Sequence, residues 1–157
     1  MNLFKNMLKE NESLFRDEIA LDYDYLPKIL PYREKEQRYL ATCIKPLLQK
    51  RNGKNLLIHG PPGIGKTAAA RHVLRDLENE TDDVVPIYIN CWKKNTIFKI
   101  LTEICNQIGY RFTHNKRADE LMEEIKKILN KKSVVFVLDE IDKLEDIEFI
   151  YTVLEEI

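Results

Sequence analysis

One short segment of the chain, GPPGIGKT at residues 60–67, restricts the possible folds more than any other. Two glycines five positions apart followed by Lys and Thr are typical of a loop that binds a chain of phosphates. Such a loop must curl so that several backbone N–H groups point at the phosphates, and Gly63 and Gly65 permit that curl. Lys66 supplies a charge for the β- and γ-phosphates and is a candidate catalytic residue, and the Thr67 hydroxyl can bind Mg²⁺. The residues predicted to line the nucleotide are Gly60, Pro61, Pro62, Gly63, Ile64, Gly65, Lys66 and Thr67.

A phosphate-binding loop requires a strand before it and a helix after it, and the flanking sequence predicts both. The apolar run 56–58 lies between Gly53 and Gly60, which indicates a buried strand ending at His59. After the loop, apolar residues recur at spacings of three and four over 70–77, as on one face of a helix. A glycine-rich turn that matches the motif by chance would not explain both flanks.

A second apolar run, Val134 to Leu138, leads directly into Asp139 and Glu140. An unbroken run of this kind is typical of a parallel strand buried on both faces. Carboxylates at the carboxyl end of such a strand lie at the crevice where α/β sheets bind ligands. This is the Walker B pattern, in which Asp139 would hold Mg²⁺ and Glu140 would act as the general base for an attacking water.

The remaining elements follow from periodicity and from Pro and Gly. Residues 1–33 are predicted to form an extended arm, and residues 34–157 the nucleotide-binding part. A helix is predicted over 33–49, with a kink near Pro46 and an end closed by Gly53. Residues 84–90 are predicted to form a strand, and Pro86 places it at a sheet edge because proline cannot donate to a ladder. Further helices are expected over 96–108, 118–129 and 147–157.

Between the two middle helices, residues 110–117 combine three cations and a histidine with aromatic and polar residues. Arg111, Lys116 and Arg117 could contact the backbone of a nucleic acid. A solvated basic loop is the commoner explanation of such a stretch, and the residues alone leave both interpretations open.

Composition limits the class of protein. The chain has 157 residues, a formal net charge of −1 and 44% hydrophobic residues, which suits one soluble domain or less. Its three cysteines, Cys43, Cys91 and Cys105, lack the paired spacing of a zinc site and are expected to be buried, reduced thiols. The segment 1–10 mixes apolar residues with charges, so neither a targeting signal nor a membrane span is predicted, and a cytoplasmic location is expected.

Four segments together, YDYLPKILPYRE, NLLIHGPPGIGKT, VVPIYINC and VVFVLDEIDKL, resemble the origin-recognition-complex type of DNA replication initiator. The resemblance is strongest to the archaeal initiators related to the cell-division-cycle helicase loader, which are AAA+ ATPases. It implies an α/β fold, a P-loop AAA+ parallel sheet flanked by helices, with the strand that contains Pro86 at its edge. The Asp-Glu pair and the absence of an Asn-Lys-x-Asp signature favour ATP or ADP over guanine nucleotides.

The resemblance also implies roles for other residues. The arm would fold over the adenine, with Leu26 and Pro27 as apolar contacts and Arg33 supporting the pocket. An insertion between the second strand and Walker B contacts origin DNA in these initiators, which raises Arg111, Lys116 and Arg117 above a plain solvated loop. Origin DNA, the replicative helicase and other initiator subunits are the implied partners. Nucleotide state would act as a switch, and in an archaeal cell the protein would be associated with the nucleoid.

The chain departs from this family after residue 157, because the fourth strand with its sensor residue, the lid and the winged-helix domain of such proteins are not in the sequence. In the AAA+ sheet that fourth strand lies between the phosphate-loop strand and the Walker B strand. We therefore expect only the N-terminal part of an ATPase domain, with hydrolysis uncertain. The alternatives are another AAA+ ATPase, such as a clamp-loader or helicase-loader subunit, and a truncated non-catalytic regulator. The Ile141 that follows Asp139-Glu140 argues against a clamp loader, where Asp-Glu-Ala-Asp is usual.

Overall fold

The computed structural model describes residues 25–27, 30–130, 132–145, 150–151 and 153. Most of the predicted arm and much of the predicted final helix, including Ile147, Leu154 and Ile157, lie outside these residues. The elements in chain order are α1 (Glu34–Leu48), α2 (Lys66–Glu80), β1 (Val84–Asn90), α3 (Ile97–Gln107), α4 (Ala118–Leu129), β2 (Ser133–Asp139) and the 3₁₀ turn η2 (Ile141–Lys143). The predicted bounds of β1 and α4 are confirmed, and those of α1 and α3 are confirmed to within one residue.

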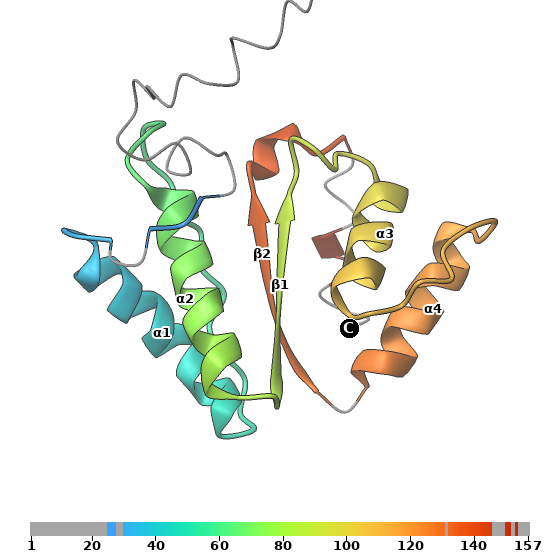
Figure 1. The fold of residues 1–157 in the computed structure, drawn as a ribbon, viewed down its shortest axis with the longest axis horizontal. Helices are drawn as coiled ribbons and strands as arrows, with labels where there is room; N and C mark the ends of the chain where they lie inside the picture. Colours follow the sequence, from blue (N-terminus) through green and yellow to red (C-terminus); the bar gives the residue numbers. More distant parts are fainter. Residues whose placement is uncertain (1–24, 28–29, 131, 146–149, 152, 154–157) are drawn as a thin grey trace, which may run out of the picture.

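The two strands form a parallel pair in register from Val84 opposite Ser133 to Asn90 opposite Asp139. Helices α1 and α2 lie on one side of the pair and α3 and α4 on the other (Figure 1). Parallel strands need a long crossover between them, and α3 with α4 provides it here. The predicted α/β architecture, a parallel sheet flanked by helices, is therefore confirmed.

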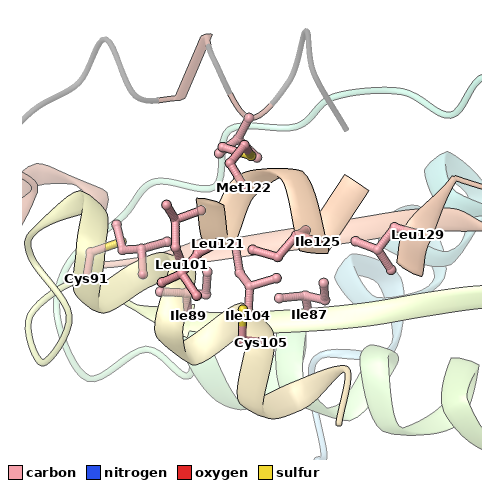
Figure 2. Packing of buried hydrophobic residues seen from close by; sticks show 12 residues of the cluster. Ile87, Ile89, Cys91, Leu101, Ile104, Cys105, Leu121, Met122, Ile125 and Leu129 are labelled. Atoms are coloured by element: carbon pink, nitrogen blue, oxygen red, sulfur yellow. The ribbon is translucent and has the colours of Figure 1, made fainter. Parts of the chain in front are cut away.

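The core lies between the sheet and the α3–α4 side (Figure 2). The helical stripes predicted for these two helices supply most of it, because their apolar residues recur every three or four positions. The cluster contains Ile87, Ile89, Cys91, Ile100, Leu101, Ile104, Cys105, Leu121, Met122, Ile125, Leu129 and Val153. Val153 is helical and buried, so the described part of the predicted final helix packs on this core.

The other side of the sheet is covered by α2, whose predicted stripe is buried. Ala70, Val73 and Leu74 belong to this stripe, and α1 packs against α2 with Cys43 buried. All three cysteines are free and buried, as predicted. The phosphate-loop segment is thereby joined to a helix that is anchored on β1.

Two predictions about strands are wrong. Residues 56–58 form no strand, and their side chains are exposed at 41% for Leu56, 78% for Leu57 and 45% for Ile58. The strand β2 is half-buried along its length instead of buried on both faces. Both results have one physical cause. A strand needs a hydrogen-bonding neighbour, and among the described residues β1 is the only strand that pairs with β2.

The end of α1 also differs from the prediction. The helix stops at Leu48, and the residue with left-handed backbone is Lys50, at φ 56°, instead of Gly53. Glycine at position 53 is favoured for a different reason, because a Cβ there would lie 3.2 Å from the carbonyl oxygen of Cys43, a tight contact. A glycine lets the chain pass this close to the helix end before it continues toward the loop.

Candidate functional site

The segment 60–67 curls at the N-terminus of α2. Gly63 and Gly65 have φ values of 78° and 86°, which side chains rarely allow, and Gly65 is the residue that begins the helix. At Gly60, with φ 152°, an added Cβ would lie 2.7 Å from Cδ1 of Ile64. The curl therefore depends on glycine chiefly through the backbone angles at these three positions, because the Ile64 methyl near Gly60 is the end of a flexible side chain.

Lys66 reaches back into this curl. Its Nζ donates to the carbonyl oxygens of Gly60 and Pro61, both at 2.9 Å. No side chain caps the helix that begins here. The first N–H groups of a helix have no partner within the helix, and they give its N-terminus a positive end. An ammonium group and free N–H donors at one exposed loop make a site for an anion.

The two halves of the predicted site meet at Asp139. Thr67 Oγ1 donates to Asp139 Oδ2 at 2.7 Å, across 72 residues of sequence. Thr67 is the second residue of α2 and Asp139 is the last of β2. A hydroxyl beside a carboxylate is a pair of hard oxygen ligands suited to Mg²⁺. Among the described residues no three His, Cys, Asp or Glu side chains gather as a metal cage.

Asp139 has a second partner that the sequence interpretation did not include. The hydroxyl of Tyr88 donates to the same oxygen, Oδ2, at 2.7 Å. Burial, together with the hydrogen bond to Asp139, raises the pKa of Tyr88 above its ordinary value, so the phenol keeps its proton and remains a donor. The Arg71 guanidinium lies 5.4 Å from the centre of the Tyr88 ring.

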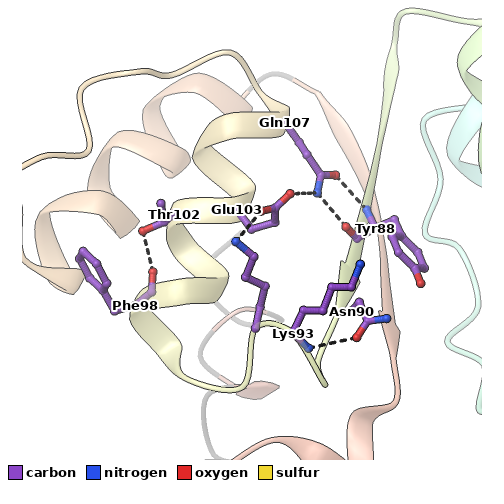
Figure 3. Close-up of polar contacts among 8 residues, drawn as sticks. Tyr88, Asn90, Lys93, Phe98, Thr102, Glu103 and Gln107 are labelled. Atoms are coloured by element: carbon purple, nitrogen blue, oxygen red, sulfur yellow. Dashed lines mark hydrogen bonds and ion pairs between the residues drawn. The ribbon is translucent and has the colours of Figure 1, made fainter. Parts of the chain in front are cut away.

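The backbone of Tyr88 is held by Gln107, at the end of α3 (Figure 3). The Gln107 side chain accepts from the Tyr88 N–H at 3.1 Å and donates to the Tyr88 carbonyl oxygen at 2.7 Å. The same amide donates to Glu103 at 3.1 Å. Tyr88 could have been suspected from the alternation in β1, because Tyr88 and Asn90 stand two apart and share a face that Ile87 and Ile89 do not, whereas no signal in the sequence points to Gln107.

An open pocket of about 480 Å³ lies beside this arrangement. It is lined by Thr67, Arg71, Tyr88, Asn90, Lys93, Lys94, Glu103 and Gln107. Asn90 forms the turn after β1, where its side-chain oxygen accepts from the N–H groups of Trp92 and Lys93. Lys94 pairs with Glu103 at 3.1 Å. The pocket therefore brings Thr67 and Tyr88, the two donors to Asp139, together with three cationic side chains.

Glu140, the predicted general base, follows β2 directly and is exposed. Its backbone has φ 54° and ψ 44°, a left-handed conformation that is uncommon outside glycine and asparagine. Strain of this kind persists where the surrounding structure enforces it, and it is frequent at functional sites. The turn η2 that follows carries the ion pair between Asp142 and Lys143, at 2.9 Å.

The described end of the arm touches the loop at one point. Arg33 Nε donates to the carbonyl oxygen of Ile64 at 3.0 Å and also pairs with Glu36. Leu26 and Pro27 are half-buried. Arg33 is thus next to the phosphate loop, while no contact between Leu26 or Pro27 and the loop is among the described interactions.

The basic loop 110–117 lies apart from these residues, between α3 and α4. Lys116 is 3.6 Å from Glu124 and 5.2 Å from the centre of the Tyr110 ring. Arg117 pairs with Asp119 at 3.6 Å, and its N–H donates to Glu120. Arg111 is exposed. Two of the three predicted DNA contacts are therefore also bound to neighbouring carboxylates or aromatic rings.

Comparison with known proteins agrees with this arrangement. The model of the AAA domain family matches residues 49–157. ORC1-type DNA replication protein 1 of Archaeoglobus fulgidus is 34% identical over 92% of this chain and 37% of its own length. ORC1-type DNA replication protein 1 of Aeropyrum pernix is 38% identical over 83% of this chain and 35% of its own length. The resemblance to origin-recognition-complex type initiators is therefore confirmed, and the chain spans a little over a third of these relatives.

Solved structures share the fold. The Aeropyrum pernix ORC1 protein in complex with DNA superposes with a TM-score of 0.69 at 36% identity, over 82% of this chain and 35% of that one. The Aeropyrum pernix ORC2 protein, in ADPNP and ADP complexes, gives a TM-score of 0.73 at 24% identity, over 90% of this chain and 41% of that one. At this level of identity the match supports the fold alone. In the part of the chain that the structure describes, no helix is long and apolar enough to cross a membrane. Because the family model matches residues 49–157, and Thr67 after the curled loop meets Asp139 at the end of β2, the chain belongs to the AAA domain family.

Proposed function

We propose that this chain is the nucleotide-binding part of a DNA replication initiator, with ATP or ADP held by residues 60–67 and Mg²⁺ held by Thr67 and Asp139. The observation that carries the proposal is the 2.7 Å hydrogen bond from Thr67 to Asp139. It joins a phosphate loop and a Walker B carboxylate that lie far apart in the sequence. Within the proposal, residues 1–33 are the arm over the nucleotide and residues 34–157 are the N-terminal part of the AAA+ ATPase domain.

The residues present fit an anionic ligand. The loop is exposed from Gly60 to Ile64, and an uncapped helix N-terminus lies behind it. Lys66 already contacts the loop carbonyl oxygens and would exchange them for phosphate oxygens. Leu26, Pro27 and Arg33 would support the base and the loop from the arm. Bound Mg²⁺ would offset the charge of the phosphates.

Glu140 would accept a proton from an attacking water at its carboxylate, since it follows the metal-holding Asp139 at the carboxyl end of β2. Hydrolysis would serve to change the nucleotide state, and that state would act as a switch for the initiator. This role is part of the proposal because the chain spans only about a third of the relatives that are named as replication proteins.

Replication-origin DNA is the proposed partner of the basic loop, with Arg111, Lys116 and Arg117 on the phosphate backbone. The support is the 36% identity to an ORC1 protein that was solved in complex with DNA. The replicative helicase and other initiator subunits are the further partners proposed, in the cytoplasm or nucleoid.

The nucleotide site is tested by titrating fluorescent ADP and ATP, with Mg²⁺, into the chain and into Lys66→Ala. Removing a charge-assisted hydrogen bond costs roughly 1.5–3 kcal/mol, so the affinity should fall by about 10- to 150-fold. Lys54→Ala, an exposed lysine before the loop, is the matched control and should bind as the unchanged chain does. Equal affinities in all three proteins would overturn the site.

The DNA contact is tested by measuring duplex affinity against salt concentration for Arg111→Ala. Each phosphate contact that is lost should reduce the slope of log K against log salt by roughly one. Lys35→Ala, an exposed lysine on α1, is the control and should keep the slope. An unchanged slope in Arg111→Ala would leave residues 110–117 as a solvated loop.

A further inference from the structure

We infer that Tyr88 is a positioning residue for Asp139, whose phenol fixes one carboxylate oxygen and so leaves the other oxygen to the metal or its waters. The inference rests on the proposed function, since it assigns a role within that nucleotide and Mg²⁺ site. It adds a residue on β1, which carries neither Walker motif.

The geometry at the carboxylate is asymmetric. Thr67 and Tyr88 both donate to Asp139 Oδ2, each at 2.7 Å, instead of one to each oxygen. Two donors from different elements, α2 and β1, fix the rotation of the carboxylate group about its last bond. Donors that hold a metal-binding carboxylate in this way commonly govern metal affinity by setting the orientation of the ligand.

The strand register explains how Tyr88 reaches this position. Tyr88 lies opposite Val137, and Asn90 lies opposite Asp139. Side chains alternate between the two faces of a sheet, so Tyr88 and Asp139 point to the same face and stand one pleat apart. The aromatic ring is long enough to bridge that step, whereas the shorter Asn90 forms the turn instead.

Tyr88 is itself held from two directions. Gln107 binds both of its backbone groups, at 3.1 and 2.7 Å, and the Arg71 guanidinium lies 5.4 Å from the ring centre. Arg71 stands one helical turn after Thr67 on α2, so one helix face supplies both the cation over the Tyr88 ring and the second donor to Asp139. The phenol therefore has little freedom to leave Asp139, which is the property that a positioning residue needs.

The test is a titration of Mg²⁺ into the full chain with fluorescent ADP bound, for the unchanged protein, Tyr88→Phe and Tyr110→Phe. In Tyr88→Phe the apparent Mg²⁺ affinity should fall by about 10- to 100-fold, the range found when partners behind metal ligands are removed. Its ADP affinity in EDTA should equal that of the unchanged protein, because the phosphate loop is untouched. Tyr110→Phe removes another half-buried phenol, beside Lys116, and should alter neither quantity.

The outcomes separate this inference from the proposed function. If the unchanged chain binds no ADP with or without Mg²⁺, the proposed function fails and this role fails with it. If it binds and Tyr88→Phe matches Tyr110→Phe, only the role of Tyr88 is overturned. If Tyr88→Phe loses ADP affinity in EDTA, or does not fold, Tyr88 supports the structure at large and the positioning role is also overturned.

Discussion

The side chain of Gln107 closes the outer edge of β1, and its removal should weaken that edge in a measurable way. Parallel strands present alternate backbone groups to opposite sides, and the N–H and C=O of Tyr88 point away from β2. Gln107 meets both, accepting at 3.1 Å and donating at 2.7 Å, as a neighbouring strand would do. Pro86, two residues earlier, has no N–H to offer. The edge is thereby closed to another strand.

The expected cost of Gln107→Ala follows from these contacts. A typical internal hydrogen bond contributes about 0.5–1.5 kcal/mol to stability, so losing two should lower the free energy of unfolding by roughly 1–3 kcal/mol. Alanine's better helix propensity offsets a few tenths of a kcal/mol of this, since the site is near the end of α3. The amide of Tyr88 should lose about tenfold or more of its protection against hydrogen exchange, because its acceptor is gone.

Urea denaturation and residue-resolved hydrogen exchange are the measurements, with Asn106→Ala as the control. Asn106 precedes Gln107 on the same helix and is exposed, so its replacement should be neutral or slightly stabilising. Unchanged exchange at Tyr88 in Gln107→Ala would refute the reasoning. It would mean that water hydrogen-bonds the backbone groups of Tyr88 as well as the Gln107 side chain does.

Three further results are expected. Gly65→Ala and Gly109→Ala both place a Cβ at positive φ, 86° and 83°, with no atom within 4 Å, so urea denaturation should show a similar loss of roughly 1–2 kcal/mol in the free energy of unfolding. Only Gly65→Ala should also weaken ADP binding. Equal ADP affinity in the two variants would contradict the assignment of the phosphate loop. Burial and the charge of Asp139 raise the pKa of the Cys91 thiol to about 11 from an ordinary value of 9.0. Between these two pH values the folded chain keeps a proton that the unfolded chain loses, so the free energy of unfolding should fall as pH rises from 9 to 11. If the free energy of unfolding of Cys91→Ala falls between pH 9 and 11 as steeply as that of the unchanged chain, this explanation is wrong. Ile104→Ala, at a side chain with 0% exposure, should lower the free energy of unfolding by about 2–5 kcal/mol, and a loss below 1 kcal/mol in urea would contradict its place in the core.

The sequence was sufficient for the elements that are defined locally. Helices α3 and α4 follow from apolar residues at spacings of three and four, and β1 from a β-branched run whose proline also marks the edge. The position of Asp139 beside the loop could be predicted because strands with apolar sequences end at ligand sites in α/β sheets, while its role as a Walker B residue stays a prediction. These inferences need only neighbouring residues and general rules of packing.

The failures concern partners that are distant in sequence. Residues 56–58 have a strand composition, yet composition does not supply the neighbour that a strand must pair with. Gln107 looks like a polar residue at the end of a helix, and its bond to Tyr88 depends on how α3 packs on β1. The left-handed backbone at Lys50 instead of Gly53 likewise depends on where α1 stops, which differs from the prediction by one residue.

The parallel pairing of β1 and β2 has a consequence for the order in which the chain folds. The strands can pair only after α3, the basic loop and α4, which connect them in sequence, have been made, and contacts across long loops form slowly. The Thr67–Asp139 hydrogen bond spans 72 residues, so it depends on that closure. During synthesis the phosphate loop leaves the ribosome well before Asp139 does. The newly made loop therefore has no carboxylate partner for that interval, and under the proposed function the onset of Mg²⁺-dependent nucleotide binding would mark completion of the sheet.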